Sequence, residues 1–442
     1  METVLLYVVG VLVMVVGIAA SIALHELGHF VPAKLFGVKV GQFMIGFGKT
    51  IFSRRRGETE FGVKALPLGG YITMAGMYPP ATEGSRARTS STGFFQTLVQ
   101  DARSVSADTI AEGEEHRTFY RLPVFKRIII MLGGPAMNLL IAVVLYGVVL
   151  SGFGVAQEST TLGSVSACVL PATSERQECE PGDPIAPGAE GGLEPGDVLV
   201  SLGGTEVESW QQATAIIRDA AGDDLDVVVE RDGETLPLTV TPSLTERYVV
   251  DDDGQIVEDA NGAPVTQEVG FLGIGAALEN VRQPVTAVPA AVGDNVVRVA
   301  EIIINLPQRL IDVADAAFGQ GERDPNGPLS VVGVGRVAGE IASIDTIPIV
   351  DRVSVLVGLL ASLNVALFVF NLVPLLPLDG GHIAGALVEG VRRFFAKLFG
   401  RKDPGPIDTA KLVPLTLVVV MLLGAMSLLL IYADIVKPID FF

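Results

Sequence analysis

Four long apolar stretches decide which folds are open to this chain. Each is long enough, at about 1.5 Å per residue in a helix, to cross roughly 30 Å of hydrocarbon. Of the 442 residues, 49% are hydrophobic, which is too apolar for an ordinary soluble enzyme. The pattern predicts a polytopic α-helical membrane protein whose two termini lie on one side. The stretches cover residues 4–24, 128–150, 353–376 and 412–432.

The charged residues predict which side each connection occupies. Lys and Arg outnumber Asp and Glu by 14 to 8 between residues 31 and 127, and by 6 to 3 between residues 389 and 411. Between residues 157 and 348 there are 9 arginines, no lysine and 33 acidic residues. Since cytoplasmic connections carry an excess of Lys and Arg, we expect the middle region and both termini to be extracytoplasmic.

The first apolar stretch has one alternative, a cleaved signal peptide, because small residues lie near its end at 19–23. The only charge before the apolar run is Glu2, and the basic residues come after the run. A signal peptide has the opposite order of charges, so this stretch is interpreted as a membrane span.

The connections differ in character. Residues 37–77 alternate glycine with β-branched and aromatic residues, which predicts strands and turns, whereas 79–118 are polar and are expected to form a mobile loop. Residues 191–242 predict a small α+β domain with a helix at 210–220 and a hairpin turn at 231–233. The predicted order is a first span at 1–30, a cytoplasmic-side β-hairpin or re-entrant, membrane-associated region with its loop at 31–126, a second span at 127–155, an extracytoplasmic domain at 160–282, interfacial amphipathic helices at 283–350, a third span at 351–388, a basic cytoplasmic loop at 389–411 and a fourth span at 412–434.

The two cysteines, Cys168 and Cys179, both lie in the predicted extracytoplasmic region. An even pair in an oxidising compartment predicts a disulfide. A metal site is the competing interpretation, but no histidine accompanies the pair.

The fragment HELGH at residues 25–29 predicts metal chemistry. On a helix, His25 and His29 face the same side within about 6 Å, which suits two imidazoles that bind one metal ion. Glu26 is turned by about 100° from His25, so it is placed to hold a water molecule and not to act as a third ligand. The alternative, that both histidines simply end a helix, would bury Glu26 without a partner.

Catalytic zinc needs a third protein ligand, and the candidate is Asp379. It ends an apolar run without charge from Val353, and an ionisable residue at the end of a span is costly unless it is paired or functional. The predicted topology puts it at the same membrane depth as the HELGH fragment. Of the other histidines, His116 is expected in a solvated loop and His382 at a helix start.

Four motifs, in this order along a chain with four predicted spans, resemble those of the site-2 protease family of intramembrane zinc metalloproteases. They are HELGH (25–29), ALPLGGY (65–71), GGPAMN (133–138) and NLVPLLPLDGG (371–381). The middle domain resembles a PDZ domain in its Gly-Asp-x-Leu strand followed by Gly-Gly-x-x-Val, which makes the chain similar to the bacterial branch with a single PDZ domain. The alternative for that domain is a small β-domain without a peptide groove.

The resemblance implies that His25, His29 and Asp379 bind Zn²⁺ and that Glu26 is the general base. It implies that Asn371 holds the substrate or stabilises the oxyanion, and that Asn364 and Asn138 have supporting roles. The implied substrates are single-pass membrane proteins, such as anti-sigma factors, that a site-1 protease has shortened first. The implied location is a bacterial cell membrane, with the active site near the cytoplasmic side, the bilayer as a partner and no nucleic-acid partner.

An unwound substrate in lipid has unpaired backbone groups, so it needs a strand edge to pair with, and residues 37–77 are expected to offer one. Two other functions stay open from the sequence. One is a catalytically silent membrane scaffold that binds extracytoplasmic peptides, against which the complete ligand set argues. The other is a membrane-anchored enzyme that acts on soluble peptides.

Overall fold

The structure, a computed structural model, describes most of the chain and divides it into two compact units. The first unit comprises the residues before 154 and after 283, and the second comprises residues 154–283. The described residues are 2–79, 94–110, 113–170, 174, 176, 178–249, 257, 259, 263–319, 323–324 and 327–439.

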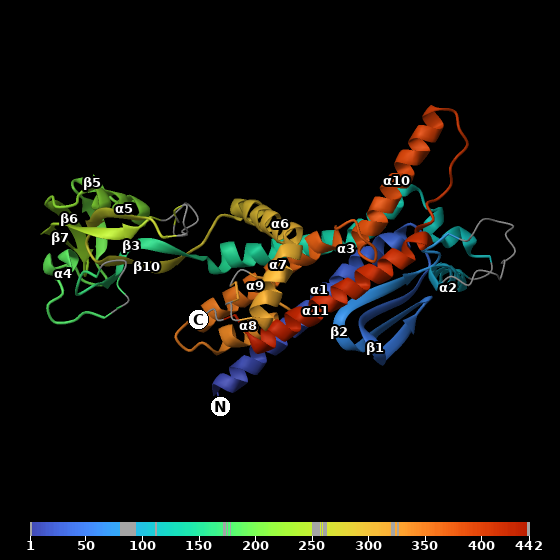
Figure 1. The fold of residues 1–442 in the computed structure, drawn as a ribbon, viewed down its shortest axis with the longest axis horizontal. Helices are drawn as coiled ribbons and strands as arrows, with labels where there is room; N and C mark the ends of the chain where they lie inside the picture. The colour runs from blue at the N-terminus through green and yellow to red at the C-terminus, as the bar shows by residue number, and fades with distance from the viewer. Residues whose placement is uncertain are drawn as a thin grey trace. The chain divides into compact units, whose positions relative to one another are not determined.

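Within the described residues of the first unit, four helices are long and apolar enough to cross a membrane (Figure 1). The first, α1, is 34 residues long and therefore spans about 50 Å, because it continues past the apolar run and through HELGH. The second continues into a π-helical turn, η3 (Val148–Phe153). The four are α1 (Glu2–Leu35), α3 (Val124–Gly147), α9 (Ile349–Asn371) and α11 (Val413–Val436), the last preceded by the 3-10 turn η5 (Thr409–Leu412).

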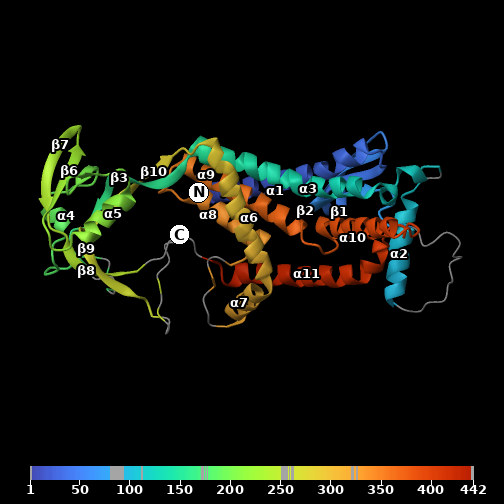
Figure 2. The ribbon, with the colours of Figure 1, turned by 90° about the horizontal axis from the view of Figure 1, so that it is seen from above.

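Shorter elements surround these helices. Helix α6 packs on α3 and α9 while α7 packs on α11, so the pair crosses the long helices (Figure 2). The shorter helices are α2 (Phe94–Asp108), α6 (Val288–Ile304), α7 (Leu306–Phe318), α8 (Val331–Ser343) and α10 (Asp379–Leu398), with 3-10 turns η1 (Glu115–Arg117), η2 (Phe119–Arg121) and η4 (Val285–Ala287).

Strands β1 (Val40–Arg56) and β2 (Thr59–Met74) form the predicted hairpin, but both strands bend. Because of the bend, Ile45 of β1 is paired with Val63 on one side and with Gly70 on the other. The hairpin is thus a small curled sheet in which Val63 is internal, since it also pairs with Phe52. The last part of β2, from Gly70 to Met74, pairs on one side only and is an edge.

The prediction of one third span over 351–388 is wrong. Helix α9 ends at Asn371, and Asp379 begins a separate helix, α10. Pro374 and Pro377 lie between them, and proline cannot continue a helix because it lacks the backbone N–H and clashes with the preceding turn. The predicted basic loop at 389–411 is also corrected, because α10 is helical to Leu398.

The predicted mobile loop at 79–118 contains helix α2. The rest of the chain holds this helix: Arg103 forms an ion pair with Asp408, and the Ser106 hydroxyl accepts a hydrogen bond from the Tyr78 N–H at 3.0 Å. The polar composition of residues 79–118 gives no indication of these contacts with residues elsewhere in the chain. Residues 80–93 and 111–112 of the predicted loop lie outside the described residues.

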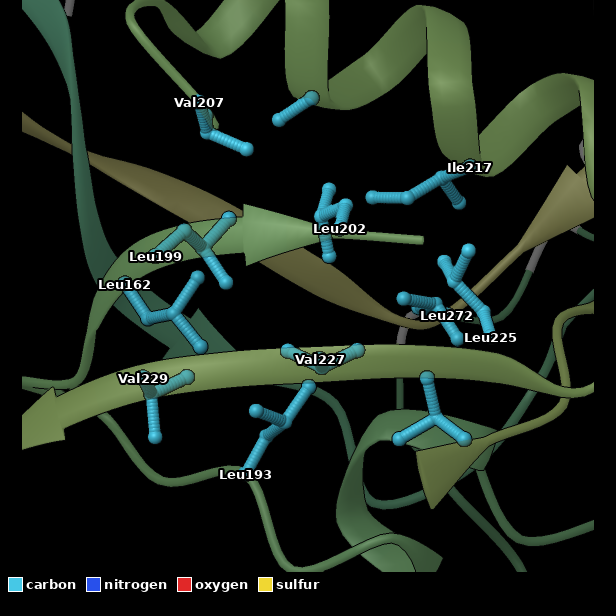
Figure 3. Packing of buried hydrophobic residues seen from close by; sticks show 12 residues of the cluster. Leu162, Leu193, Leu199, Leu202, Val207, Ile217, Leu225, Val227, Val229 and Leu272 are labelled. Atoms are coloured by element: carbon cyan, nitrogen blue, oxygen red, sulfur yellow. The ribbon is translucent and has the colours of Figure 1, made fainter. Parts of the chain in front are cut away.

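The second unit is built on a six-stranded sheet ordered β10-β3-β4-β6-β7, in which β5 pairs with β4. Helix α5 (Trp210–Asp219) packs on the sheet and shares one apolar core with it, including Leu202, Ile217 and Val227 (Figure 3). The strands are β3 (Val155–Val165), β4 (Val198–Leu202), β5 (Thr205–Glu206), β6 (Leu225–Arg231), β7 (Glu234–Val240) and β10 (Ile274–Val281), with a separate hairpin of β8 (Ser243–Tyr248) and β9 (Thr266–Phe271) and a short helix α4 (Pro187–Glu190).

The turn predicted at 231–233 joins β6 to β7, with Asp232 and Gly233 at positive φ of 53° and 81°. Such angles suit a two-residue hairpin of the twist that paired strands need. Cys168 and Cys179 are joined as a disulfide between β3 and α4.

Asp197 is a buried carboxylate that stabilises the second unit. It accepts hydrogen bonds from Arg231 Nε at 2.6 Å and Nη2 at 2.8 Å, and these bonds hold the pKa of Asp197 below its usual range. The stabilisation is therefore complete at neutral pH and is lost only as the pH falls below the ordinary carboxyl range.

We expect Asp197→Asn to lower the free energy of unfolding of this unit by about 2 kcal/mol, because a hydrogen-bonded charge is lost. Hydrogen exchange of β4 and β6 amides in the full chain measures the change. Asp223→Asn, at an exposed position, is the control. Equal protection in both variants would contradict the assigned role of the pair.

Candidate active site

Helix α1 carries the HELGH residues inside its last turns, so their side chains are set by regular helix geometry. His25 and His29 lie one turn apart, with ring centroids separated by 4.8 Å. Asp379, the first residue of α10, faces both rings. The structure thus brings together the three residues that the sequence suggested as ligands.

The three ligand atoms form a nearly equilateral triangle. Nε2 of His25 lies 3.2 Å from Nε2 of His29, and Oδ2 of Asp379 lies 3.3 Å from each nitrogen. Tetrahedral zinc with bonds of about 2.0–2.1 Å separates its ligands by about 3.3 Å. No described residue hydrogen-bonds to Oδ2 of Asp379, which leaves its lone pairs free for a cation. The donor set and its spacing fit Zn²⁺ with one position left open.

Neighbouring groups on α3 orient both imidazole rings. Nδ1 of His29 donates to the Ile130 carbonyl at 2.7 Å, which leaves Nε2 with its lone pair. The Asn138 amide lies 3.1 Å from Nδ1 of His25, and its Oδ1 has no hydrogen bond partner among the described residues. A half-turn of that amide lets Oδ1 accept the Nδ1 hydrogen, which also frees Nε2 of His25.

Gly134 lets α3 approach the two histidines closely. A Cβ at this position would lie 2.2 Å from Nε2 of His29 and 2.8 Å from Cε1 of His25. Since no real Cβ contact is so short, any side chain here would occupy the place of the ligand atoms. The GGPAMN motif therefore contributes a position without a side chain, Gly134, and the amide that contacts His25, Asn138.

Glu26 is only 8% exposed, and it lines a cavity. No described residue forms a hydrogen bond or an ion pair with its carboxylate. A buried carboxylate of this kind needs a water molecule or a substrate group as its partner. Gly70 of β2 packs against it, because a Cβ there would lie 2.8 Å from Cγ of Glu26. The second glycine of ALPLGGY thus brings the edge of the hairpin to the candidate base.

The cavity has a volume of about 440 Å³ and is mostly apolar. Its polar lining residues are His25, Glu26, Asn138, Ser330 and Asn371, and most of the others are aliphatic. The lining comes from α1 (Val15, Ile18, Ile22, His25, Glu26), β2 (Gly69, Gly70), α3 (Asn138), the start of α8 (Leu329, Ser330, Val331, Val334) and α9 (Leu363, Leu367, Asn371). Such a cavity can hold an apolar chain segment beside a polar reaction centre.

The remaining predicted residues lie in different places. Asn371 ends α9 and lines the cavity. Asn364 is fully buried and donates to the Ser21 hydroxyl at 3.0 Å, so it ties α9 to α1 and does not line the cavity. His116 is exposed in η1, and His382 lies in the first turn of α10 beside a cavity lined by Arg127 and Glu389.

Sequence reasoning missed Gly70, Gly134, Ser21 and the Ile130 carbonyl. The motifs ALPLGGY and GGPAMN contain both glycines, and a polar Ser21 within an apolar span was the only local signal for its contact. A backbone carbonyl has no signal in the sequence at all.

The sequence profile of peptidase family M50 matches residues 13–402. The chain belongs to peptidase family M50. This M50 peptidase is 34% identical over 456 residues to the zinc metalloprotease Rip1 of Mycobacterium tuberculosis, a match that covers 99% of this chain and 100% of the relative. Rip1 of Mycolicibacterium smegmatis is 34% identical over 461 residues, with the same coverage. The metalloprotease MmpA of Caulobacter vibrioides is 28% identical over 399 residues, covering 87% of this chain and 88% of the relative.

The family that the motifs resembled is thereby confirmed, because the match extends over most of the M50 peptidase. The predictions of a zinc metalloprotease and of Zn²⁺ as its cofactor agree with this family and with the names of its full-length relatives. The four apolar helices make it a multi-pass membrane protein.

Proposed function

We propose that this M50 peptidase is a zinc-dependent intramembrane endopeptidase that hydrolyses peptide bonds in or near the transmembrane segments of single-pass membrane proteins. The observation that carries the proposal is the triangle of His25, His29 and Asp379, next to an apolar cavity that His25 and Glu26 line among membrane-length helices. The aliphatic cavity between such helices argues against a peptidase of soluble peptides. The oriented set of ligands argues against a catalytically silent scaffold.

The chain's own residues supply proton transfer and orientation. When bound by His25, His29 and Asp379, zinc supplies a Lewis acid that acidifies water and stabilises negative charge on a carbonyl oxygen. Glu26 takes a proton from the attacking water and delivers it to the leaving amine. The amide of Asn371, which also lines the cavity, can donate a hydrogen bond to the developing oxyanion. Ile130 and Asn138 keep the imidazoles aligned throughout.

A direct test of this function uses two substrates with the same scissile sequence, one within a detergent-solubilised transmembrane helix and one as a soluble peptide. We expect the transmembrane substrate to be cleaved and the soluble peptide to be cleaved at least about tenfold more slowly, which corresponds to about 1.4 kcal/mol. A zinc chelator should stop both reactions. Equal rates for the two substrates would favour a membrane-anchored peptidase of soluble peptides.

Backbone pairing at the hairpin edge is proposed to hold the unwound substrate. A helical substrate must expose backbone N–H and C=O groups before it is cut, and each costs several kcal/mol in an apolar environment unless it is paired. The edge that begins at Gly70 pairs on one side only, and Gly69 and Gly70 line the cavity. An extended segment added to this edge would pass beside Glu26.

Ile72→Pro tests the edge, since Ile72 pairs with Phe43 only. We expect cleavage to fall by about tenfold or more with zinc content unchanged, because proline removes a backbone donor. Val63 is the poorer site, since it pairs on both sides and proline there would disrupt the sheet itself. Phe52→Pro, on the opposite edge and 65% exposed, is the matched control. A similar loss in both variants would argue against substrate pairing at Gly70–Met74.

Membrane sidedness is also proposed from the charges. The basic connections at 31–127 and 389–411 favour the cytoplasm, and the acidic region between them favours the outside of a bacterial cell membrane. The HELGH end of α1 and the start of α10 would then lie near the cytoplasmic side, with both termini outside. Reporter fusions at residue 440 and within 80–93 should give opposite sidedness.

The second unit is proposed to be an extracytoplasmic PDZ-like domain that screens substrates already shortened by a site-1 protease. A groove of about 560 Å³ in this unit supports a peptide-binding role over a domain without a groove. It lies between α5 and the β9–β10 connection, and its lining includes Trp210, Arg247, Phe271 and Gly273.

Deletion of residues 156–281 should relax the requirement for prior trimming, so that an intact single-pass substrate is cut as fast as a trimmed one. Cleavage of both forms in cells measures this ratio. A trimming requirement that survives the deletion would exclude the filter. Anti-sigma factors are the substrate class that we propose.

A further inference from the structure

Helix α10 carries an apolar face that no described part of the chain covers. Its members recur every three or four residues, so they lie along one side of the helix, and each is between 48% and 64% exposed. We call this face the α10 stripe. It consists of Leu387, Val388, Val391, Phe394, Phe395 and Leu398.

The rest of α10 is anchored, so the stripe cannot turn inward. Glu389, on the other side of the helix, is 1% exposed and forms an ion pair with Arg127 of α3. It also accepts a hydrogen bond from the Ile407 N–H at 3.0 Å. These contacts fix the rotation of α10 about its axis, and the carboxyl end of the helix extends away from the other helices of the unit (Figure 1).

Exposed basic residues accompany the stripe. Arg392 and Lys397 lie on α10, and Arg401 and Lys402 follow it in the chain; all four are exposed and form no ion pair with any residue that the structure describes. Arg393 differs, because it is paired with Glu389 at 3.1 Å and Asp403 at 3.4 Å. An exposed apolar stripe with unpaired cations beside it is the arrangement of helices that lie in a membrane surface.

An apolar cavity adjoins the start of the stripe. It has a volume of about 260 Å³ and lies between α10 and α11, with Val388 of the stripe among its lining residues. The aliphatic residues Leu375, Leu376, Ile407, Leu412 and Leu415 also line it. This cavity is separate from the one that contains Glu26.

We propose that the α10 stripe and its basic residues form a binding surface for anionic phospholipid, with the headgroups held by Arg392, Lys397, Arg401 and Lys402 and acyl chains against the stripe and in the cavity. Position favours lipid over a second protein copy, because the chain enters α10 from one membrane-length helix, α9, and leaves it for another, α11, which keeps α10 near the membrane. Charge favours an anionic surface, which attracts clustered Lys and Arg. Because α10 begins at Asp379, lipid binding also fixes the helix that carries this ligand.

The single tryptophan of the chain makes a direct test possible. The full-length protein with Trp210→Phe and Phe395→Trp has its only indole on the stripe. It is reconstituted into bilayers of phosphatidylcholine and phosphatidylglycerol in equal parts. In one preparation the phosphatidylcholine is brominated and in the other the phosphatidylglycerol, in both cases at acyl-chain carbons close to the headgroup. We expect either lipid to quench the indole on the stripe strongly, and brominated phosphatidylglycerol to quench it more. Native Trp210, in the chain without substitutions, is the control and should not be quenched.

Neutralising the basic residues separates headgroup recognition from simple apolar contact. With Arg392→Gln, Lys397→Gln, Arg401→Gln and Lys402→Gln added, the two brominated lipids should quench equally, while unchanged zinc content shows that the start of α10 is intact. Equal quenching before neutralisation would overturn the anionic preference. Absence of quenching would overturn the lipid surface altogether, as would a dimer by native mass spectrometry whose formation requires the stripe.

Discussion

Glu26→Gln should lower the rate of cleavage by about 10²–10⁴-fold while the protein still binds one zinc ion per chain, because proton transfer is lost and the ligands remain. The glutamine keeps the size of the side chain against Gly70, so the cavity should not collapse. Cleavage of a transmembrane model substrate by purified protein, together with elemental analysis for zinc, measures both quantities. Glu2→Gln, in the first turn of the same helix, is the matched control and should cleave at the wild-type rate.

A loss smaller than about tenfold would assign the base to another group and remove Glu26 from its proposed role. Loss of zinc together with activity would mean instead that Glu26 supports the ligands. In cells, the same substitution should cause trimmed single-pass membrane proteins to accumulate. Proteomic analysis of those membranes would show whether the proposed substrate class is correct.

Gly134→Ala should remove zinc binding and proteolysis together. The added Cβ would lie 2.2 Å from Nε2 of His29, and His29 cannot move aside without losing its hydrogen bond to the Ile130 carbonyl. Helix propensity alone predicts the opposite, since alanine stabilises a helix relative to glycine by about 1 kcal/mol. The test therefore separates the close approach of α3 from any general effect on the helix. Elemental analysis and the rate of cleavage of the model substrate are the readouts.

Gly147→Ala is the matched control, because it lies in the same helix and nothing stands within 4 Å of its added Cβ. We expect this variant to keep its zinc and its activity. Full zinc occupancy in Gly134→Ala would show that α3 does not approach the histidines as described. An equal loss in both variants would point to a general requirement for flexibility in α3.

Features with a local period were predictable from the sequence. The apolar stretches predicted four spans because burial in lipid requires about twenty consecutive apolar residues, and the described part of the chain contains four such helices. The turn at Asp232 and Gly233 was predictable because few residues accept positive φ. His25 and His29 share a face because they are four residues apart on a helix.

Helix ends and distant partners required the tertiary structure. The excess of basic residues at 389–411 predicted a loop, although the apolar residues there recur with the period of a helix, α10. Pro374 and Pro377 separate this helix from α9. The contact of Asn138 with His25 and the approach of Gly134 to His29 join segments that are far apart in the sequence.

The sequence by itself therefore determined the membrane class, the family, three candidate metal ligands and a candidate general base. Only the tertiary structure decided how the ligand atoms meet, which edge of the hairpin lies beside Glu26 and where α10 exposes its stripe. The physical reason is that periodic patterns report how one element faces its surroundings. The packing of several elements at one point depends on shapes and backbone groups that no single segment specifies.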